Sequence, residues 1–202
     1  KQMWYKLDAN GNVTKETTTE YSDALKHRIE HALLNAPFSG GLQMGVTWKK
    51  QLSLTMDWTF LAGVYSLNND RYFLENNVSG GFMMLNLSKK LNNEWRDDLT
   101  DEEKTKVTAP KFDEQTVVDD RFLENSSFLR LKNIQLAYTF PKSVFGTQKV
   151  ITGAKVYVSA RNLLTVTSKE YNGFDPETSA GGLTMNKFPN TRQFVGGIQL
   201  MF

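Results

Sequence analysis

The feature that most constrains the fold is a strict alternation of apolar and polar side chains over long stretches. In LSLTMDWTFLAGV, residues 52–64, apolar side chains occupy every second position, and only Leu61 interrupts the opposite, polar set. The same period of two recurs in GLQMGVTW (41–48) and NIQLAYTF (133–140). This period is typical of β-strands whose two faces meet different surroundings. The chain is therefore predicted to be all-β.

We expect about six strands in the whole chain. Two of them are separated only by residues 49–51, which predicts a tight antiparallel hairpin. The expected strands run from the start of the chain to Leu7 and over Gly40–Trp48, Leu52–Val64, Ser126–Phe140, Ala154–Val166 and Thr191–Phe202.

Two kinds of protein use such two-faced strands. One is a soluble β-sandwich, in which one face packs on a core and the other meets water. The other is a membrane β-barrel, whose tilted strands need about 9 to 11 residues, whereas soluble strands average about five or six. The stretch Leu52–Val64 has the membrane length, and aromatic residues such as Trp48, Tyr138 and Phe202 lie near strand ends, as in the girdles at a membrane interface. These features favour an antiparallel transmembrane β-barrel.

The connections between the expected strands alternate in length. Residues 49–51 and 141–153 are short to moderate links, whereas 66–126 and 166–190 are long and polar, which is typical of barrels with short periplasmic turns and long outer loops. The first long link contains FMMLNLSKKLNNEW (82–95), which predicts a short amphipathic helix. The acidic run that follows, 96–106, is expected to be a solvated loop, because its carboxylates lack the spacing of a calcium-binding loop.

Composition excludes several other classes. With 202 residues, 40% hydrophobic and 23% charged content, a net charge of +2 and no cysteine, the chain has neither a disulfide framework nor a polyelectrolyte surface for nucleic acid. It contains no continuous apolar run of about 18 residues, so no helical membrane span is predicted. Because it starts KQMWYKL, without an initiator Met or a signal peptide, we expect it to be the interior of a longer protein.

The search for catalytic chemistry finds no motif. His27 and His31 are four residues apart in HRIEH, but this is not the HExxH pattern of a zinc protease, and no third ligand follows at a typical spacing. Neither a phosphate-binding loop nor a nucleophile elbow occurs. The sequence therefore predicts no enzyme, no metal site and no cofactor.

Three segments resemble, in order, those of a known family. They are DDRFLENSSFLRLKNIQLAYTFPKSVF (119–145), VYVSARNLLTVTSKEYNGFDPET (156–178) and the closing NKFPNTRQFVGGIQLMF (186–202). Together with LNAPFSGGLQMGVTWKKQLSLTMDW (34–58) and LSKKLNNEW (87–95), they resemble the SusC/RagA-type TonB-dependent outer-membrane transporters over nearly the whole chain.

The resemblance implies a fold, a function and partners. Members are 22-stranded barrels that import oligosaccharides or peptides beneath a SusD-like surface lipoprotein, driven by the TonB complex. This chain, residues 1–202, resembles only the carboxy-terminal barrel part, so the plug and the amino-terminal domains are expected to lie outside it. The implied location is the bacterial outer membrane. The implied partners also include the barrel-assembly machinery and membrane lipid.

Candidate functional residues follow from these expectations. Among residues of the polar strand faces, Asp57, Gln135 and Arg161 are expected to face the lumen, because a charge facing lipid is costly. The outer-loop aromatics Trp95 and Tyr171 could stack on a sugar ring or simply pack within their loops.

Two further motifs concern architecture rather than cargo. In GFDPE, Asp175 precedes a proline and is expected to start a turn rather than to bind cargo. The end of the chain resembles the assembly signal of outer-membrane barrels through Gly197, Leu200 and Phe202, although Val195 stands where that signal has a polar residue. The alternative to an importer segment is a stand-alone β-sheet binding protein or a small porin-like barrel.

Overall fold

A computed structural model describes residues 3–29, 32–76, 86–107, 118, 120–146, 150–177, 182–184 and 187–202. The chain divides into two compact units, which are described separately. The first contains residues 1–32 and 68–123, and the second contains residues 33–67 and 124–202. No helix among the described residues is long and apolar enough to cross a membrane.

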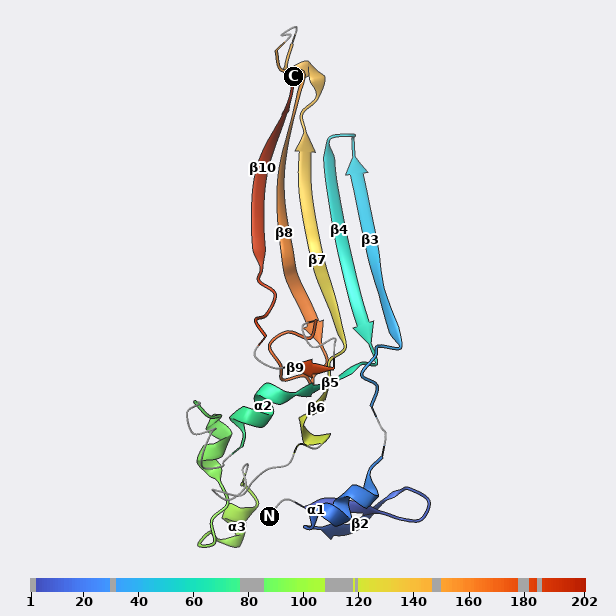
Figure 1. Cartoon of the computed structure of the whole chain (residues 1–202). Helices are drawn as coiled ribbons and strands as arrows, with labels where there is room; N and C mark the ends of the chain where they lie inside the picture. Colours follow the sequence, from blue (N-terminus) through green and yellow to red (C-terminus); the bar gives the residue numbers. More distant parts are fainter. Residues whose placement is uncertain are drawn as a thin grey trace. The chain divides into compact units, whose positions relative to one another are not determined.

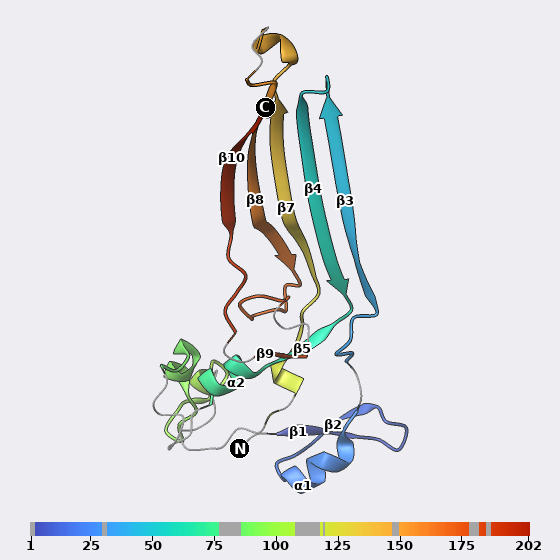
Figure 2. The ribbon, with the colours of Figure 1, turned by 45° about the horizontal axis from the view of Figure 1, so that its top comes forward.

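The second unit is built on a five-stranded antiparallel sheet (Figure 1). Its strands lie in the order β10-β8-β7-β4-β3, so that β3 and β10 form the two edges, as the turned view in Figure 2 also shows. The strands are β3 (Phe38–Trp48), β4 (Leu52–Ala62), β7 (Phe128–Thr139), β8 (Gly153–Thr167) and β10 (Gln193–Met201). Each matches an expected strand to within two residues at either end.

The hairpin between β3 and β4 has the expected tight turn. Trp48 pairs with Leu52, and the Gln51 N–H donates to the Trp48 carbonyl at 3.1 Å. Lys49 and Lys50 both have positive φ, 50° and 56°. Two successive residues with positive φ give the turn a twist that matches the right-handed twist of the flanking strands.

The sheet has one apolar and one polar face. Pairs such as Met44–Met56 and Leu54–Leu136 lie on the apolar face, whereas Gln43–Asp57 and Gln135–Ser159 lie on the polar face. The apolar face leaves large side chains exposed on all five strands, among them Leu42, Val46, Trp48, Phe60, Leu136, Val158, Phe194 and Ile198.

A β-bulge in β7 keeps this separation of faces intact. Asn133 pairs with Asp57, but Leu131 pairs with Trp58, so Lys132 is an extra residue in β7. Without this extra residue, simple alternation would place Arg130 on the same face as Leu136. The bulge resets the alternation, and Arg130 lies opposite Thr59 on the polar face.

The shorter elements flank the sheet in sequence. A three-stranded sheet has the order β6-β5-β9, formed by β5 (Tyr65–Asn68), β6 (Leu123–Asn125) and β9 (Leu183–Thr184). A 3-10 helix, η5 (Lys142–Val144), follows β7. The first unit contains β1 (Trp4–Leu7), β2 (Val13–Thr18), α1 (Tyr21–Ala24), η1 (Leu25–His27), α2 (Asn69–Leu74), η3 (Lys89–Asn93), α3 (Asp101–Lys104) and η4 (Asp120–Phe122).

Two expectations for the first unit need correction. The strand that ends at Leu7 is β1, but it does not join the large sheet: it pairs with β2 in a separate two-stranded sheet, so the large sheet has five strands rather than about six. β2 is close in sequence and offers β1 a local partner. Of the helix expected over 82–95, residues 82–85 lie outside the described residues, and the described part contains the short 3-10 helix η3.

The open sheet leads to a prediction for the isolated chain. β3 and β10 each have one neighbour among the described strands, and the apolar face is uncovered. Unpaired edges and a large exposed apolar surface promote association. We expect the 202-residue chain, expressed alone, to form aggregates in buffer and to show no heat-modifiable monomer in detergent, as measured by light scattering and by electrophoresis of unboiled samples. A compact monomer would instead support the stand-alone alternative.

Candidate functional site

A row of polar side chains crosses all five strands of the sheet on its polar face. The cross-strand register places Gln43 beside Asp57, Asp57 beside Asn133, Asn133 beside Arg161 and Arg161 beside Gln193. The Asn133 side-chain amide donates to Asp57 Oδ2 at 3.2 Å. The row thus brings one carboxylate and one guanidinium to the same level of the sheet.

The three residues predicted to face a lumen share this polar face. Asp57 and Arg161 belong to the row, and Gln135 lies two residues further along β7, between Thr55 and Ser159. The second carboxylate oxygen of Asp57, Oδ1, is buried and accepts no hydrogen bond from any described residue. The polar face thus contains a carboxylate oxygen that has no hydrogen-bond partner among the described residues.

A buried ion cluster fastens the loop between β8 and β10 to strand β7. Arg130 is 2% exposed and Asp175 is 3% exposed. The Arg130 guanidinium donates to Asp175 Oδ1 at 2.5 Å and to Glu177 Oε2 at 2.7 Å. Lys132, the bulged residue, pairs with the other Glu177 oxygen. We call Arg130, Lys132, Asp175 and Glu177 the loop clamp.

Asp175 organises its own loop as well as binding Arg130. Its Oδ1 accepts the Glu177 N–H at 3.0 Å, and its Oδ2 accepts the Asn190 N–H at 2.8 Å. The first bond closes a turn of the kind that Asp favours before proline, which confirms the prediction that Asp175 starts a turn. The carboxylate therefore joins the two ends of the loop and the strand beneath them.

The electrostatics of Asp175 reflect these bonds. Burial by itself raises the pKa of the Asp175 carboxyl, but the hydrogen bonds from Arg130 and from the backbone N–H groups of Asn190 and Glu177 outweigh it. The net result is a pKa below the ordinary value of 3.8. The Asp175 carboxylate is thus charged at neutral pH.

A second attachment holds the start of the same loop. The buried Glu124 side chain accepts the Asn172 N–H at 2.9 Å and the Asn172 side-chain amide at 3.2 Å. The Ser168 N–H donates to the Ser127 carbonyl at 3.1 Å. The start of the loop is therefore tied to β6 and to the residue that follows it closely, Ser127.

The two predicted loop aromatics have different surroundings. Tyr171 is half-buried, and its ring lies so close over Gly173 that a Cβ added there would be 2.3 Å from the tyrosine hydroxyl oxygen. Trp95 is 36% exposed, with the Lys104 ammonium 5.8 Å from its ring centre. Tyr171 thus packs within its loop, whereas Trp95 presents part of its ring to solvent.

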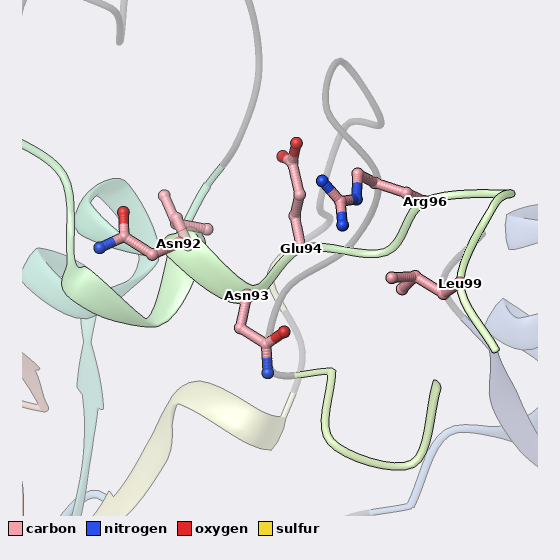
Figure 3. A pocket seen from close by; sticks show the side chains of 6 residues that line it. Asn92, Asn93, Glu94, Arg96 and Leu99 are labelled. Atoms are coloured by element: carbon pink, nitrogen blue, oxygen red, sulfur yellow. The ribbon is translucent and has the colours of Figure 1, made fainter. Parts of the chain in front are cut away.

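A cavity of about 330 Å³ lies in the first unit, and its lining includes both sequence neighbours of Trp95 (Figure 3). Its lining is mostly polar and consists of Leu91, Asn92, Asn93, Glu94, Arg96 and Leu99. The acidic run after it folds into α3, which begins with a capping box between Thr100 and Glu103. Its exposed carboxylates form local ion pairs, Asp101 with Lys104 and Glu102 with Lys106. The run is therefore solvated, as predicted, but part of it is a helical turn rather than a loop.

One member of the histidine pair, His27, makes a hydrogen bond to the backbone. His27 accepts the Leu7 N–H at Nδ1, at 3.0 Å, and so supports the β1–β2 hairpin. His31 lies outside the described residues. Among the residues that the structure describes, no group of three or more His, Asp or Glu side chains could hold a metal ion.

Sequence reasoning missed the clamp and two exposed aromatics. Phe174 is 74% exposed and Phe188 is 92% exposed, and both belong to the clamped loop. Their exposure could have been predicted from their sequence neighbours: in GFDPE and KFPN each phenylalanine lies in a polar, proline-containing segment without apolar neighbours to pack on. The signal for Arg130 was a charge within an otherwise apolar stretch of strand, FLRL.

The residues of the predicted assembly signal lie in and after β10. Gly197 pairs with Tyr157 and Leu200 pairs with Ala154 on the neighbouring strand. Leu200 and the terminal Phe202 are exposed. In this structure the segment is an ordinary edge strand, joined to β8 along its whole length.

Long antiparallel strands with one apolar and one polar face define the wall of a transmembrane β-barrel, here as an open sheet. Comparisons with known proteins agree. The chain is 47% identical to a chain in the structure of the RagAB peptide importer in the closed-closed state, with a TM-score of 0.80 over 99% of this chain and 21% of that one. For a chain in the open-open state the identity is 45% and the TM-score is 0.82, over 100% of this chain and 20% of that one.

Curated relatives point to the same family. TonB-dependent receptor SusC of Bacteroides thetaiotaomicron is 29% identical over 97% of this chain, and TonB-dependent receptor P3 of Formosa agariphila is 33% identical over 48% of it. This chain spans only 17% and 10% of their lengths. No protein-family model matches the chain. The resemblance to one part of the SusC/RagA-type TonB-dependent transporters is thus confirmed.

The loop clamp generates a prediction about loop order. Removing one partner of a buried ion pair leaves a buried charge and costs about 3 to 5 kcal/mol. We expect Arg130→Gln in the full-length protein to expose residues 168–177 to proteinase K, measured as the cleavage rate by mass spectrometry. Lys169→Gln, which removes an exposed charge from the same loop, is the control. Equal cleavage of both variants and the parent would show that the clamp does not order the loop.

The lowered pKa of Asp175 predicts how the loop responds to acid. A carboxyl whose folded pKa is depressed contributes stability above its unfolded value, and this stability is lost as pH falls through the folded pKa. Amide exchange of the loop, corrected for intrinsic rates, should therefore stay slow at pH values above 3.8 and accelerate only below it. In Asp175→Asn the protection should be weak at every pH. A loss of protection already near neutral pH would contradict the clamp.

Proposed function

We propose that this chain forms part of the barrel wall and outer loops of a TonB-dependent outer-membrane importer of oligosaccharides or peptides, working with a SusD-like lipoprotein. The observation that carries the proposal is the two-faced sheet, whose match to chains of a peptide importer extends over 99% of this chain at 47% identity. Because the match to SusC is lower, at 29%, peptides are the favoured cargo. The domain itself is proposed to be the carboxy-terminal part of the barrel.

The two faces support an orientation. Turning the apolar face to lipid buries side chains such as Val46 and Ile198 in hydrocarbon and turns the polar row toward the lumen. The reverse would put Arg161 in lipid, at a cost of about 2 to 4 kcal/mol near the bilayer midplane. Asp57, Gln135 and Arg161 are therefore proposed to line the lumen, in an outer membrane.

The loops provide the groups that would meet cargo and partner. Trp95 has a partly exposed ring, and its sequence neighbours Glu94 and Arg96 line a polar cavity. Such a segment suits a ligand with both apolar and hydrogen-bonding surface. Tyr171 is proposed as a second contact that also packs its loop. The clamped loop holds Phe174 and Phe188 out toward solvent, and exposed aromatics on an ordered loop are typical protein contacts. We assign Phe174 and Phe188 to the contact with the lipoprotein.

The remaining partners follow from the same proposal. The energy-transducing TonB contact would be made by parts of the full-length protein outside residues 1–202, and Gly197, Leu200 and Phe202 would be read by the barrel-assembly machinery. The alternative, a stand-alone sheet protein or small porin, keeps the two faces but needs neither lipoprotein nor energy.

Peptide uptake tests the proposal directly. Cells that carry the full-length protein should accumulate a fluorescent oligopeptide mixture, and a protonophore should abolish the accumulation. Phe188→Ser should reduce both uptake and the amount of lipoprotein that co-purifies, because losing a buried aromatic contact removes a large share of interface energy.

The matched control is Val144→Ser. Val144 is 61% exposed but lies in η5, in the link between β7 and β8 at the other end of these strands. The Val144→Ser variant should change neither peptide uptake nor the amount of lipoprotein that co-purifies. Uptake that survives the protonophore would favour the porin alternative. If Phe188→Ser and Val144→Ser had equal effects, the assignment of Phe188 to the lipoprotein contact would be wrong.

A further inference from the structure

The last strand, β10, poses a register problem. It contains two adjacent glycines, Gly196 and Gly197, and strands that are rich in glycine specify their pairing register weakly. Yet β10 pairs with β8 without interruption from Gln193–Arg161 to Met201–Gly153. Some feature other than side-chain bulk on β10 must therefore set the register.

The side chain of Tyr157 supplies this feature. Tyr157 on β8 lies directly opposite Gly197, and its ring occupies the space that a side chain at Gly197 would need. A Cβ added to Gly197 would be 2.5 Å from both Cζ and the hydroxyl oxygen of Tyr157. Real Cβ atoms do not approach this closely, so a side chain at position 197 would fit only if the Tyr157 ring moved away.

The requirement concerns space rather than backbone conformation. Gly197 lies inside a regular strand, and the described glycines with positive φ are Gly11, Gly63, Gly146 and Gly182. The neighbouring Gly196 faces the other way, and a Cβ added there would be 3.9 Å from the Tyr157 carbonyl oxygen, an ordinary contact. Two adjacent glycines in the same strand thus have different requirements.

The Tyr157 ring is compatible with one register of β10 and conflicts with registers shifted by two residues. A slip by two residues would place Val195 or Gln199 opposite Tyr157, and either would bring a side chain into the space of the ring. A slip by one residue would turn the apolar residues of β10 to the polar face. Gly197 is therefore the residue of β10 that can lie opposite Tyr157 without conflict.

A similar arrangement occurs at the other edge of the sheet. Gly40 on β3 lies opposite Phe60 on β4, and a Cβ added to Gly40 would be 2.9 Å from the Phe60 ring. Both edge strands thus place a glycine under an aromatic ring of the neighbouring strand. Such covering of edge glycines by aromatic side chains is a known way to stabilise β-sheets.

We propose that Tyr157 and Gly197 form a register lock that sets the pairing of the last strand during assembly of the barrel. Gly197 leaves space on β10, and Tyr157 is the positioning residue whose ring fills that space. The glycine of the closing segment is then required by its partner on β8, in addition to any recognition of that segment by the assembly machinery. The lock concerns assembly and is independent of any cargo.

The test measures assembly of the full-length protein and its register separately. Assembly is the heat-modifiable fraction in outer-membrane preparations. Because residues 1–202 contain no cysteine, thiol cross-linking can report the register: Val156→Cys with Ile198→Cys marks the native pairing, and Val156→Cys with Leu200→Cys marks a slip by two. We expect Gly197→Ala to lower the folded fraction about tenfold, as overpacking of a tight contact does.

Three further variants make the result decisive. Gly196→Ala, the matched control, should assemble normally. Tyr157→Ala should raise the slipped cross-link, whereas Tyr157→Phe, which keeps the ring, should not. In the double variant Tyr157→Ala with Gly197→Ala, assembly should return to the level of Tyr157→Ala alone. Failure of this rescue, or equal damage by Gly196→Ala, would overturn the lock and make Gly197 a recognition element instead.

Discussion

The interaction on which this structure depends most is the continuous cross-strand pairing of five long strands that keeps apolar and polar side chains on opposite faces. Asp57, Arg130 and Arg161 come from three different strands and all lie on the polar face. The other face carries large apolar side chains without a charge between them. A sheet of this kind is stable where lipid covers one side and water or protein the other. The proposed lumen positions of Asp57, Gln135 and Arg161 follow from that asymmetry.

The bulge at Lys132 shows how much depends on keeping the faces separate. One extra residue turns Arg130 to the polar face, where its guanidinium meets Asp175 and Glu177. Had the alternation continued, the same arginine would lie on the apolar face and the loop would lose its anchor. The bulge thus links the wall to the loop. Its own residue, Lys132, adds a further bond to Glu177.

The sequence predicted the large sheet well because a period of two is local information. The five strands from Phe38 onward matched their expected ranges closely. The first predicted strand forms as β1, but its place in the large sheet was wrong, because a four-residue segment, WYKL, carries too little pattern to identify its partner, and the nearby β2 pairs with it. The loop clamp could not be predicted from the sequence for another reason: Arg130 and Asp175 are 45 residues apart. Only the folded loop brings them together.

The predicted site residues show the same limit. Asp57, Gln135 and Arg161 were placed on one face correctly because parity decides a face, but their role in a lumen depends on strands beyond residues 1–202 and stays a prediction. For Tyr171, an aromatic in a polar loop, the sequence could not distinguish ligand contact from packing. Gly173 beneath its ring favours packing.

The closing strand shows why a terminal segment can be constrained more tightly than its composition suggests. Leu200 and Phe202 contribute apolar surface, and several apolar side chains could do this equally well. Gly197 differs, because its requirement is set by a ring on another strand, 40 residues earlier in the sequence. A residue with no side chain thereby carries register information, since it marks the place where a neighbour's side chain must fit. An assembly signal that ends in an aromatic residue and contains a glycine can therefore serve the final fold as well as its recognition.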